Sequence, residues 1–315
     1  MKKSMLNKVH LEGKLYQHNL TLKVTGENSK APGTEFISGT VDVATDDNIT
    51  NIVTVHYTYV TAKFGNGKEN PNFKILKDII DGKYLTCMEN GADVATKISL
   101  DTAVGLNDFY SDKEVDENGD PTLVSAKRNE GGFIRIVRDL NPDEKRRNWF
   151  DVDIVITGFT RKEADEERGY PEKGTIKGAI FDFRNALLPV EFSVTVPAAI
   201  DYFESLDASA KNPVFTRIKG TEVSEVVKRT ITTEGAFGDE VREVAYNRKD
   251  WAITWAQTDP YEWDTEETIT AADLKKAMTD RQTYLAEVKQ RYIDFKKTKD
   301  GAAAPSNKST ATFEF

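Results

Sequence analysis

The chain has 315 residues, of which 38% are hydrophobic and 30% charged, so it has the composition of a folded protein and is long enough for two domains. One cysteine and three scattered histidines exclude an intrachain disulfide and argue against a zinc site, so we expect no metal and no cofactor. The net charge of −9 argues against a uniformly basic protein that coats phosphates, but it leaves room for a local basic groove. No run approaches the roughly 18 apolar residues of a membrane span, and residues 1–9 lack the core of a signal peptide. These absences predict a cytoplasmic protein, in the host cytoplasm if viral, with no membrane partner.

An internal repeat is the most informative feature of the sequence. The stretch from Glu35 reads Glu-Phe-Ile-Ser-Gly-Thr-Val-Asp-Val-Ala, and the stretch from Gly174 reads Gly-Thr-Ile-Lys-Gly-Ala-Ile-Phe-Asp-Phe. Aligning Gly39 with Gly178 brings the apolar positions of the two stretches into step, with the alternation of a half-buried strand. Matching pairs of strands are therefore predicted at 8–13 and 153–158, at 35–44 and 174–183, and at 53–59 and 190–196.

Each set of three strands is followed by a short segment with helical spacing and then by more strands. The helical segments carry Phe73, Leu76, Ile79 and Ile80 in the first half, and Ile200, Phe203 and Leu206 in the second. The later strands are predicted at 83–88, 96–100 and 133–137, and at 214–218, 224–232 and 251–255.

This order resembles the OB-fold, a five-stranded Greek-key barrel with a helix between its third and fourth strands. The opening Asn7-Lys-Val-His-Leu-Glu-Gly-Lys-Leu15, followed by a glycine-containing second strand at 36–44, is similar to the start of the single-stranded DNA-binding protein family. The duplication resembles the tandem barrels of replication protein A and of some bacteriophage binding proteins. The resemblance implies a mainly β protein with two OB-fold-like barrels that coats single strands in replication, recombination or repair.

The predicted organisation has five parts. A barrel at 1–140 is joined by a basic linker at 141–150 to a second barrel at 151–260, and inserts are predicted at 16–33 and 109–129. An amphipathic helix at 268–298 begins near a capping box, Thr270-Ala-Ala-Asp273. Its apolar stripe is expected to dock on a barrel or to mediate oligomerisation, and consists of Leu274, Met278, Leu285, Val288, Tyr292 and Phe295.

The remainder, 299–315, is rich in Ala, Ser and Pro and is predicted to be a flexible tail. Its end, Phe313-Glu314-Phe315, resembles the partner-recruiting tails of bacterial single-stranded DNA-binding proteins. The resemblance implies contacts with replication or recombination proteins; a featureless tail is the alternative.

Single-strand binding needs aromatic faces for base stacking and cations for the backbone. In the second barrel the strand alternation points Lys177, Phe181 and Phe183 outward, with Arg184 beside them, which makes this face the preferred stacking platform. The alternative is that both phenylalanines pack beneath a loop or against the other domain. Arg217 and Lys219 are further cations on a late strand.

In the first barrel the same alternation points Phe36 and His56 outward, whereas Tyr57 and Tyr59 share the inward face of their strand. Trp251 and Trp255, four residues apart in a late strand, are likewise expected in the core. Additional phosphate or base contacts are predicted in a loop with Lys63, Phe64 and Lys68, and in the linker with Lys145, Arg146, Arg147 and Trp149; ordinary solvated loops are the alternative.

The sequence contains no constellation typical of an enzyme: it lacks a phosphate-binding Gly-rich loop, and the acidic run 116–120 fits a hairpin tip better than a calcium loop. We therefore expect a non-enzymatic protein that binds single-stranded nucleic acid, DNA rather than RNA, although the sequence leaves RNA open. The alternatives are a structural or assembly protein, such as a virion component whose barrels make protein contacts, and a hydrolytic enzyme.

Overall fold

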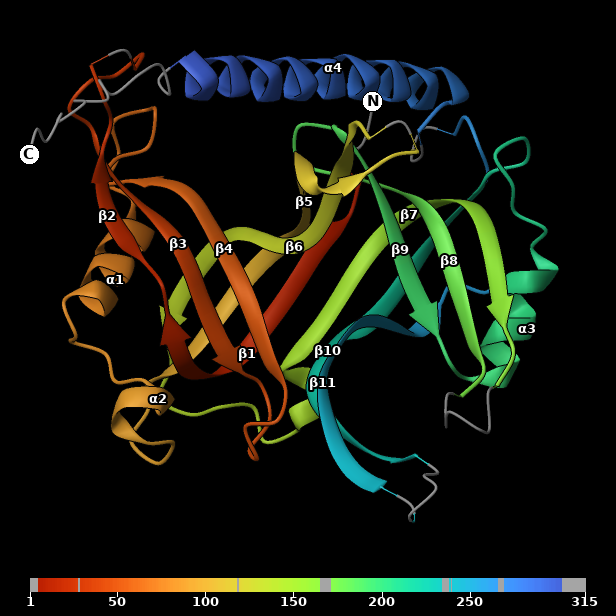
Figure 1. Cartoon of the computed structure of the whole chain (residues 1–315), viewed down its shortest axis with the longest axis horizontal. Helices are drawn as coiled ribbons and strands as arrows, with labels where there is room; N and C mark the ends of the chain where they lie inside the picture. Colours follow the sequence, from red (N-terminus) through yellow and green to blue (C-terminus); the bar gives the residue numbers. More distant parts are fainter. Residues whose placement is uncertain are drawn as a thin grey trace, which may run out of the picture.

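The structure, a computed structural model, describes residues 5–27, 29–117, 119–164, 171–233, 238, 240–265 and 269–301. Within these residues eleven strands form one continuous hydrogen-bonded sheet, and the helices are few and short except for the last. The predicted mainly β class with a C-terminal helix is confirmed. Figure 1 shows the two halves of the chain side by side, with the C-terminal helix α4 lying across both along one edge.

In the first half, five strands pair in a closed cycle. Strand β1 pairs with β3 and β5, β3 pairs with β4, and β6 completes the cycle by pairing with β5 and, in parallel, with β4. We call these five strands the first ring. The elements of this half are β1 (Asn7–His18), β2 (Thr21–Val24), β3 (Glu35–Ala44), β4 (Ile52–Thr61), α1 (Pro71–Ile80), α2 (Cys87–Asn90), β5 (Lys97–Val115) and β6 (Pro121–Ile136).

The second half repeats this pairing. Strand β7 pairs with β8 and β10, β8 pairs with β9, and β11 pairs with β10 and, in parallel, with β9; these strands are the second ring. An antiparallel ladder between β1 and β7 joins the rings. The elements are η1 (Glu144–Arg146), β7 (Asn148–Lys162), β8 (Lys173–Phe181), β9 (Leu187–Val194), α3 (Pro197–Ser205), β10 (Val214–Thr233), β11 (Glu240–Ala256) and α4 (Ala271–Gly301).

The residues aligned by the sequence repeat occupy equivalent places in the two rings. Ile37 and Ile176 are both fully buried, as the alternation predicts. A side chain at Gly39 would collide with the carbonyl oxygen of Asn19, and one at Gly178 with that of Val155. Both glycines therefore allow the second strand of a ring to approach the neighbouring backbone closely.

Two sequence predictions about strands are wrong. The segment 83–88 is not a strand: it leads into α2, because Thr86 caps that helix by accepting a hydrogen bond from the Glu89 amide at 3.2 Å. The segments 214–218 and 224–232 are not separate strands but parts of the single strand β10. The predicted linker also ends early, since β7 begins at Asn148.

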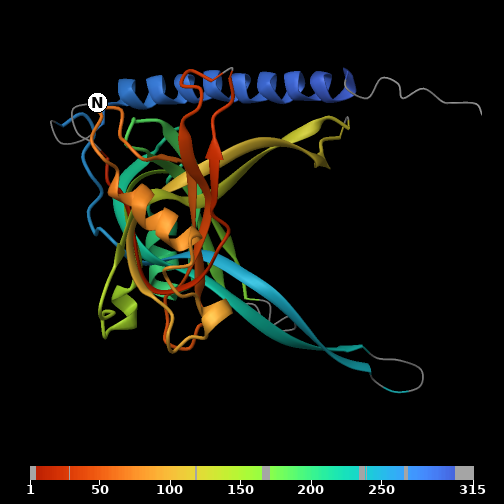
Figure 2. The same cartoon turned by 90° about the vertical axis from the view of Figure 1, so that its left-hand side faces the viewer.

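Two long hairpins extend beyond the rings, and both connect the last two strands of a ring. The first, β5–β6, turns at 116–120, where the sequence predicts a hairpin tip, and the second is β10–β11. Figure 2 shows both hairpins projecting from the same side of the molecule. We call them the first arm and the second arm.

Helix α4 docks on its own chain through one buried face. Arg281 forms two hydrogen bonds with the carboxylate of Asp108 on β5, at 2.6 and 2.7 Å, and the two side chains are only 9% and 2% exposed. Ala277 and Val288 are buried on the same face. The predicted stripe is partly wrong, because Met278 and Phe295 are exposed; the helix is oriented by its ion pair and by the small Ala277, which the hydrophobic pattern alone does not reveal.

Candidate nucleic-acid interface

An irregularity in β4 turns Tyr59, one of its two inward-predicted tyrosines, toward the outside. Gly39 pairs with Tyr57 but Ile37 pairs with Val60, so β4 contains one extra residue between these two pairs. Such a bulge shifts the following side chains to the opposite face. Tyr57 is buried as predicted, whereas the prediction that Tyr59 lies in the core is wrong, because Tyr59 is 52% exposed.

The exposed Tyr59 packs against Phe36 on the neighbouring strand. Their ring centroids are 4.7 Å apart and the ring planes are inclined by 39°. Phe36 lies on the outer face of β3, as predicted, and pairs with Lys23 on the neighbouring strand β2. The two rings form an aromatic surface on the second and third strands of the first ring, which we call the Phe36–Tyr59 surface.

Polar side chains continue this surface toward the second ring. His56 is partly exposed, and burial together with the nearby Arg128 lowers the pKa of its imidazole, which favours the neutral ring. Thr58 donates a hydrogen bond to Glu130 at 3.3 Å, and Arg128 pairs with the same carboxylate at 2.8 Å. These groups therefore connect β4 to the base of the first arm.

The loop that follows β4 carries the predicted basic and aromatic group. Lys63, Phe64 and Lys68 are all exposed, and the loop is closed by a hydrogen bond from the Phe64 amide to the Lys68 carbonyl at 2.8 Å. Gly67 has a φ of +82° in this turn, a conformation that favours glycine. The structure thus places two lysines and a phenylalanine directly beyond the end of β4.

The second ring differs at its corresponding strands. Phe181 does not point outward: it is fully buried in a cluster with Phe215, Leu187 and Ile269, because the segment before α4 covers this part of β8. Phe183 lies beyond the end of β8 and is 82% exposed, with the Arg184 guanidinium 5.0 Å from its ring centroid. The predicted outward orientation is therefore confirmed for Phe183 and wrong for Phe181, and the role of Phe183 and Arg184 in a stacking platform stays a prediction.

Lys177 is exposed on β8, as predicted, and its amino group lies 3.6 Å from Glu191 on β9. The first arm crosses this face of the second ring. Lys127 on the arm donates a hydrogen bond to the carbonyl of Glu191, and its amino group lies 4.4 Å from the ring of Phe192 and 4.9 Å from that of Trp251. Phe192 and Trp251 belong to the buried core, so Lys127 reaches the rim of the second ring, and it lines one pocket together with Lys177 on the outer face.

A polar cluster around Glu222 joins the two rings in addition to their shared apolar core, and local sequence patterns do not predict it. The Asn129 amide group donates hydrogen bonds to both oxygens of Glu222, at 2.8 and 3.1 Å, while Asn51 and Asn148 donate to the Glu222 carbonyl. Burial lowers the pKa of Lys127 to about 8 and raises the pKa of Glu222 to about 7. No sequence signal joins these residues, because Asn51, Asn129 and Asn148 lie 171, 93 and 74 positions from Glu222.

The predicted basic cluster before β7 divides into exposed and structural residues. Lys145 and Arg146 are exposed in η1. Arg147 is buried and wrong as a phosphate contact, because its guanidinium is held by the Asp47 carboxylate at 2.6 Å and by the Asn141 carbonyl. Trp149 lies in β7 and stacks on His10, with ring centroids 5.3 Å apart.

The predicted cations of β10 are engaged within the protein. Arg217 makes two hydrogen bonds, at 2.6 and 2.7 Å, with Asp151 on β7, and this carboxylate raises its pKa further. Lys219 lies 5.0 Å from the ring centroid of Trp255. Trp251 is buried as predicted but Trp255 is exposed, because a bulge in β11 turns it outward as the bulge in β4 turns Tyr59.

The remaining predicted residues, Phe313, Glu314 and Phe315, lie outside the described residues. Over the part of the chain that is described, no group of three or more His, Cys, Asp or Glu side chains is placed to hold a metal ion. Over the same residues, no helix has an apolar stretch long enough to cross a membrane.

Comparisons with known proteins identify the family. The YorF family matches residues 6–291, and the chain belongs to it. A search of curated proteins found no match. Among solved structures, the chain is similar to a deletion mutant of the single-stranded DNA-binding protein from Thermus aquaticus, with 10% identity and a TM-score of 0.46 over 84% of this chain and 98% of that one.

Proposed function

We propose that this protein is a tandem OB-fold protein that binds single-stranded nucleic acid, DNA in the first instance, and has no catalytic role. The pairing order supports the fold assignment. In each ring the third and fifth strands run parallel, and a helix lies between the third and fourth strands, as the OB-fold requires.

The Phe36–Tyr59 surface is the observation that carries the proposal. OB-folds bind oligonucleotides on their second and third strands and on the connection between the fourth and fifth. In the first ring those strands are β3 and β4, which carry the packed side chains of Phe36 and Tyr59. The connection between the fourth and fifth strands is the first arm. Exposed rings give each base a face to stack on, and Lys63 and Lys68 supply cations for the phosphates beyond the strand end.

The test is the affinity of the full chain for a fluorescently labelled thirty-base DNA strand, measured by anisotropy at low salt. We expect Phe36→Ala and Tyr59→Ala each to weaken binding by about 1–3 kcal/mol, the usual contribution of one base stack. Phe133→Ala is the matched control, because Phe133 on β6 is also 52% exposed and lies outside the Phe36–Tyr59 surface. Its affinity should equal that of the unaltered protein.

Salt and strand type provide the second measurement. Affinity should fall as salt rises, since phosphate contacts release counterions, and duplex DNA of the same length should bind far more weakly because its bases are not free to stack. Undetectable binding to the single strand at low salt, or equal binding by the three variants, would overturn the proposal. A single-stranded RNA of the same length distinguishes DNA from RNA as the preferred ligand.

A further inference from the structure

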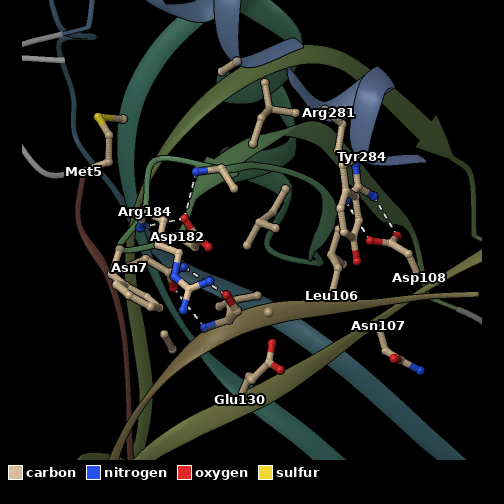
Figure 3. A pocket seen from close by; sticks show the side chains of 18 of the residues that line it. Met5, Asn7, Leu106, Asn107, Asp108, Glu130, Asp182, Arg184, Arg281 and Tyr284 are labelled. Carbon is tan, nitrogen blue, oxygen red and sulfur yellow. Dashed lines mark hydrogen bonds and ion pairs between the residues drawn. The ribbon is translucent and has the colours of Figure 1, made fainter. Parts of the chain in front are cut away.

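A cavity of about 580 Å³ lies between the two rings and beneath α4. Its walls come from four parts of the chain. Asn7 belongs to β1, Arg128 and Glu130 to the first arm, Phe183 and Arg184 to the turn between β8 and β9, and Tyr284 to α4. Figure 3 shows Arg281 and Tyr284 reaching from the helix toward Asp108 and Leu106, with Glu130 on the opposite wall. This volume is within the range of roughly 300–1,000 Å³ that small-ligand sites occupy.

Two exposed aromatic rings line this cavity from different elements. The Phe183 ring is more exposed than any other large hydrophobic side chain of the described residues, and Arg184 stacks its guanidinium over it. The Tyr284 ring is 40% exposed. Within the described part of the chain, the Arg184 guanidinium makes no ion pair, so it is available to a ligand at the cavity mouth.

Glu130 connects the wall of the cavity to β4, the strand that carries Tyr59. Glu130, in the cavity wall, accepts the hydrogen bond from Thr58, which is the neighbour of Tyr59 on β4. His56 also pairs with Glu130 in the parallel ladder between β4 and β6. The strand that carries Tyr59 therefore borders the cavity wall at Glu130.

The charges around the cavity favour an aromatic base over a phosphate. The lining contains three arginines, but Arg281 is neutralised by Asp108 and Arg128 by Glu130, and Asp182 adds a carboxylate beside Arg184. Asp280, which also lines the cavity, pairs with Lys276. A phosphate inside would therefore meet no net positive charge. A nucleobase is neutral, has two faces for the rings, and has donors and acceptors along its edge for the carboxylates and guanidinium groups.

We propose that this cavity is a base-capture site: a nucleobase of the strand bound on the Phe36–Tyr59 surface enters it and contacts Phe183 and Tyr284, while Arg184 binds an adjacent phosphate. This inference rests on the proposed function. In this proposal the first ring stacks bases on its outer surface, whereas the second ring and α4 enclose a single base in the cavity.

The experiment uses the full chain and a thirty-base thymidine strand in which one base is 5-iodouracil, placed in turn at successive positions. Irradiation links this base to an aromatic side chain that it contacts, and mass spectrometry identifies the peptide. We expect links to Phe183 or Tyr284 in addition to links to Phe36 or Tyr59. Links confined to Phe36 and Tyr59 would overturn the base-capture site and leave the proposed function intact.

Affinities of variants provide the second readout. Ala186→Trp fills the cavity from the exposed β8–β9 turn, and Tyr284→Ala removes one ring; each should weaken binding on the order of tenfold. Phe295→Ala, an exposed ring on the same helix outside the cavity, is the control and should bind unchanged. If Ala186→Trp and Tyr284→Ala bind like the unaltered protein while Tyr59→Ala binds more weakly, the base-capture site is wrong and the proposed function stands. If none of the three variants changes the affinity, the proposed function is wrong.

Discussion

The two rings have the same order of strand pairing but very different outer surfaces. On the first ring, the second and third strands carry the exposed Tyr59 and the half-buried Phe36 on their outer face. On the second ring, the segment before α4 buries Phe181, and the first arm places Lys127 against Phe192 and Trp251. The comparison teaches that a repeated strand pattern fixes the repeated core, while the connections between strands decide which surface stays accessible.

The largest expected effect comes from the neighbouring phenylalanines of the second ring. Phe181→Ala should lower the free energy of unfolding by about 3–5 kcal/mol, because it leaves a cavity in a closed cluster. Phe183→Ala should change it by less than about 0.5 kcal/mol, because that ring packs on little besides Arg184. Chemical denaturation of both variants measures the difference. Equal losses of unfolding free energy would show that Phe181 is no more buried than Phe183.

The ion pair that holds α4 to the first arm is expected to contribute nearly as much to the free energy of unfolding. Asp108→Asn leaves the Arg281 guanidinium buried without its counter-charge and should cost about 3–5 kcal/mol, with faster proteolysis of α4. Asp280→Asn on the same helix is the control: its partner Lys276 and Asp280 itself are both well exposed, so the cost should stay below about 1 kcal/mol. Similar stabilities for the two variants would mean that apolar contacts alone hold the helix.

The polar contact between the rings should make stability depend on pH. The folded pKa of Glu222, about 7, is above its ordinary value of 4.5, so the folded state binds the proton more tightly. This stabilisation is fully present below about pH 4.5 and is lost as the pH rises through 7. Asn129, Lys127 and Lys249 are the groups that act on this carboxylate.

Glu222→Gln tests this dependence, because glutamine keeps the shape and stays neutral. Relative to the unaltered protein, the variant should gain on the order of 2–3 kcal/mol between pH 4.5 and pH 8, measured by denaturation at both pH values. A difference between the two proteins that does not change with pH would show that the Glu222 carboxylate is solvated in the folded protein.

The smallest effect separates the two tyrosines of β4. The Tyr57 hydroxyl is buried, has no hydrogen-bond partner among the described residues, and burial raises its pKa. Tyr57→Phe removes this unsatisfied group and should raise the free energy of unfolding by about 1 kcal/mol. Tyr59→Phe, on the exposed side of the bulge, should leave it unchanged; a loss of stability in Tyr57→Phe would mean that its hydroxyl is satisfied by water.

Much of the candidate interface could be predicted from local alternation, and its errors have a common cause. Phe36 lies half-buried on the outer face where the alternation places it, and the predicted loop with Lys63, Phe64 and Lys68 is exposed. Tyr59 and Trp255 are misplaced because each follows a bulge, and one extra residue reverses the side-chain alternation beyond it. Arg147 and Arg217 are predicted to bind phosphates, but each forms an ion pair within the protein. Their partners, Asp47 and Asp151, lie far away in the sequence, so no local pattern indicates these pairs.

Local sequence patterns predict the mainly β class, the repeated set of strands, the positions of α1 and α3 and the existence of α4, because alternation and helical spacing are local properties of the chain. Which ring keeps an accessible outer face depends instead on tertiary contacts. The arms, the burial of Phe181 and the seating of α4 on Asp108 depend on contacts between residues far apart in the sequence. Such contacts follow from the packing of the two rings, and no local pattern encodes them.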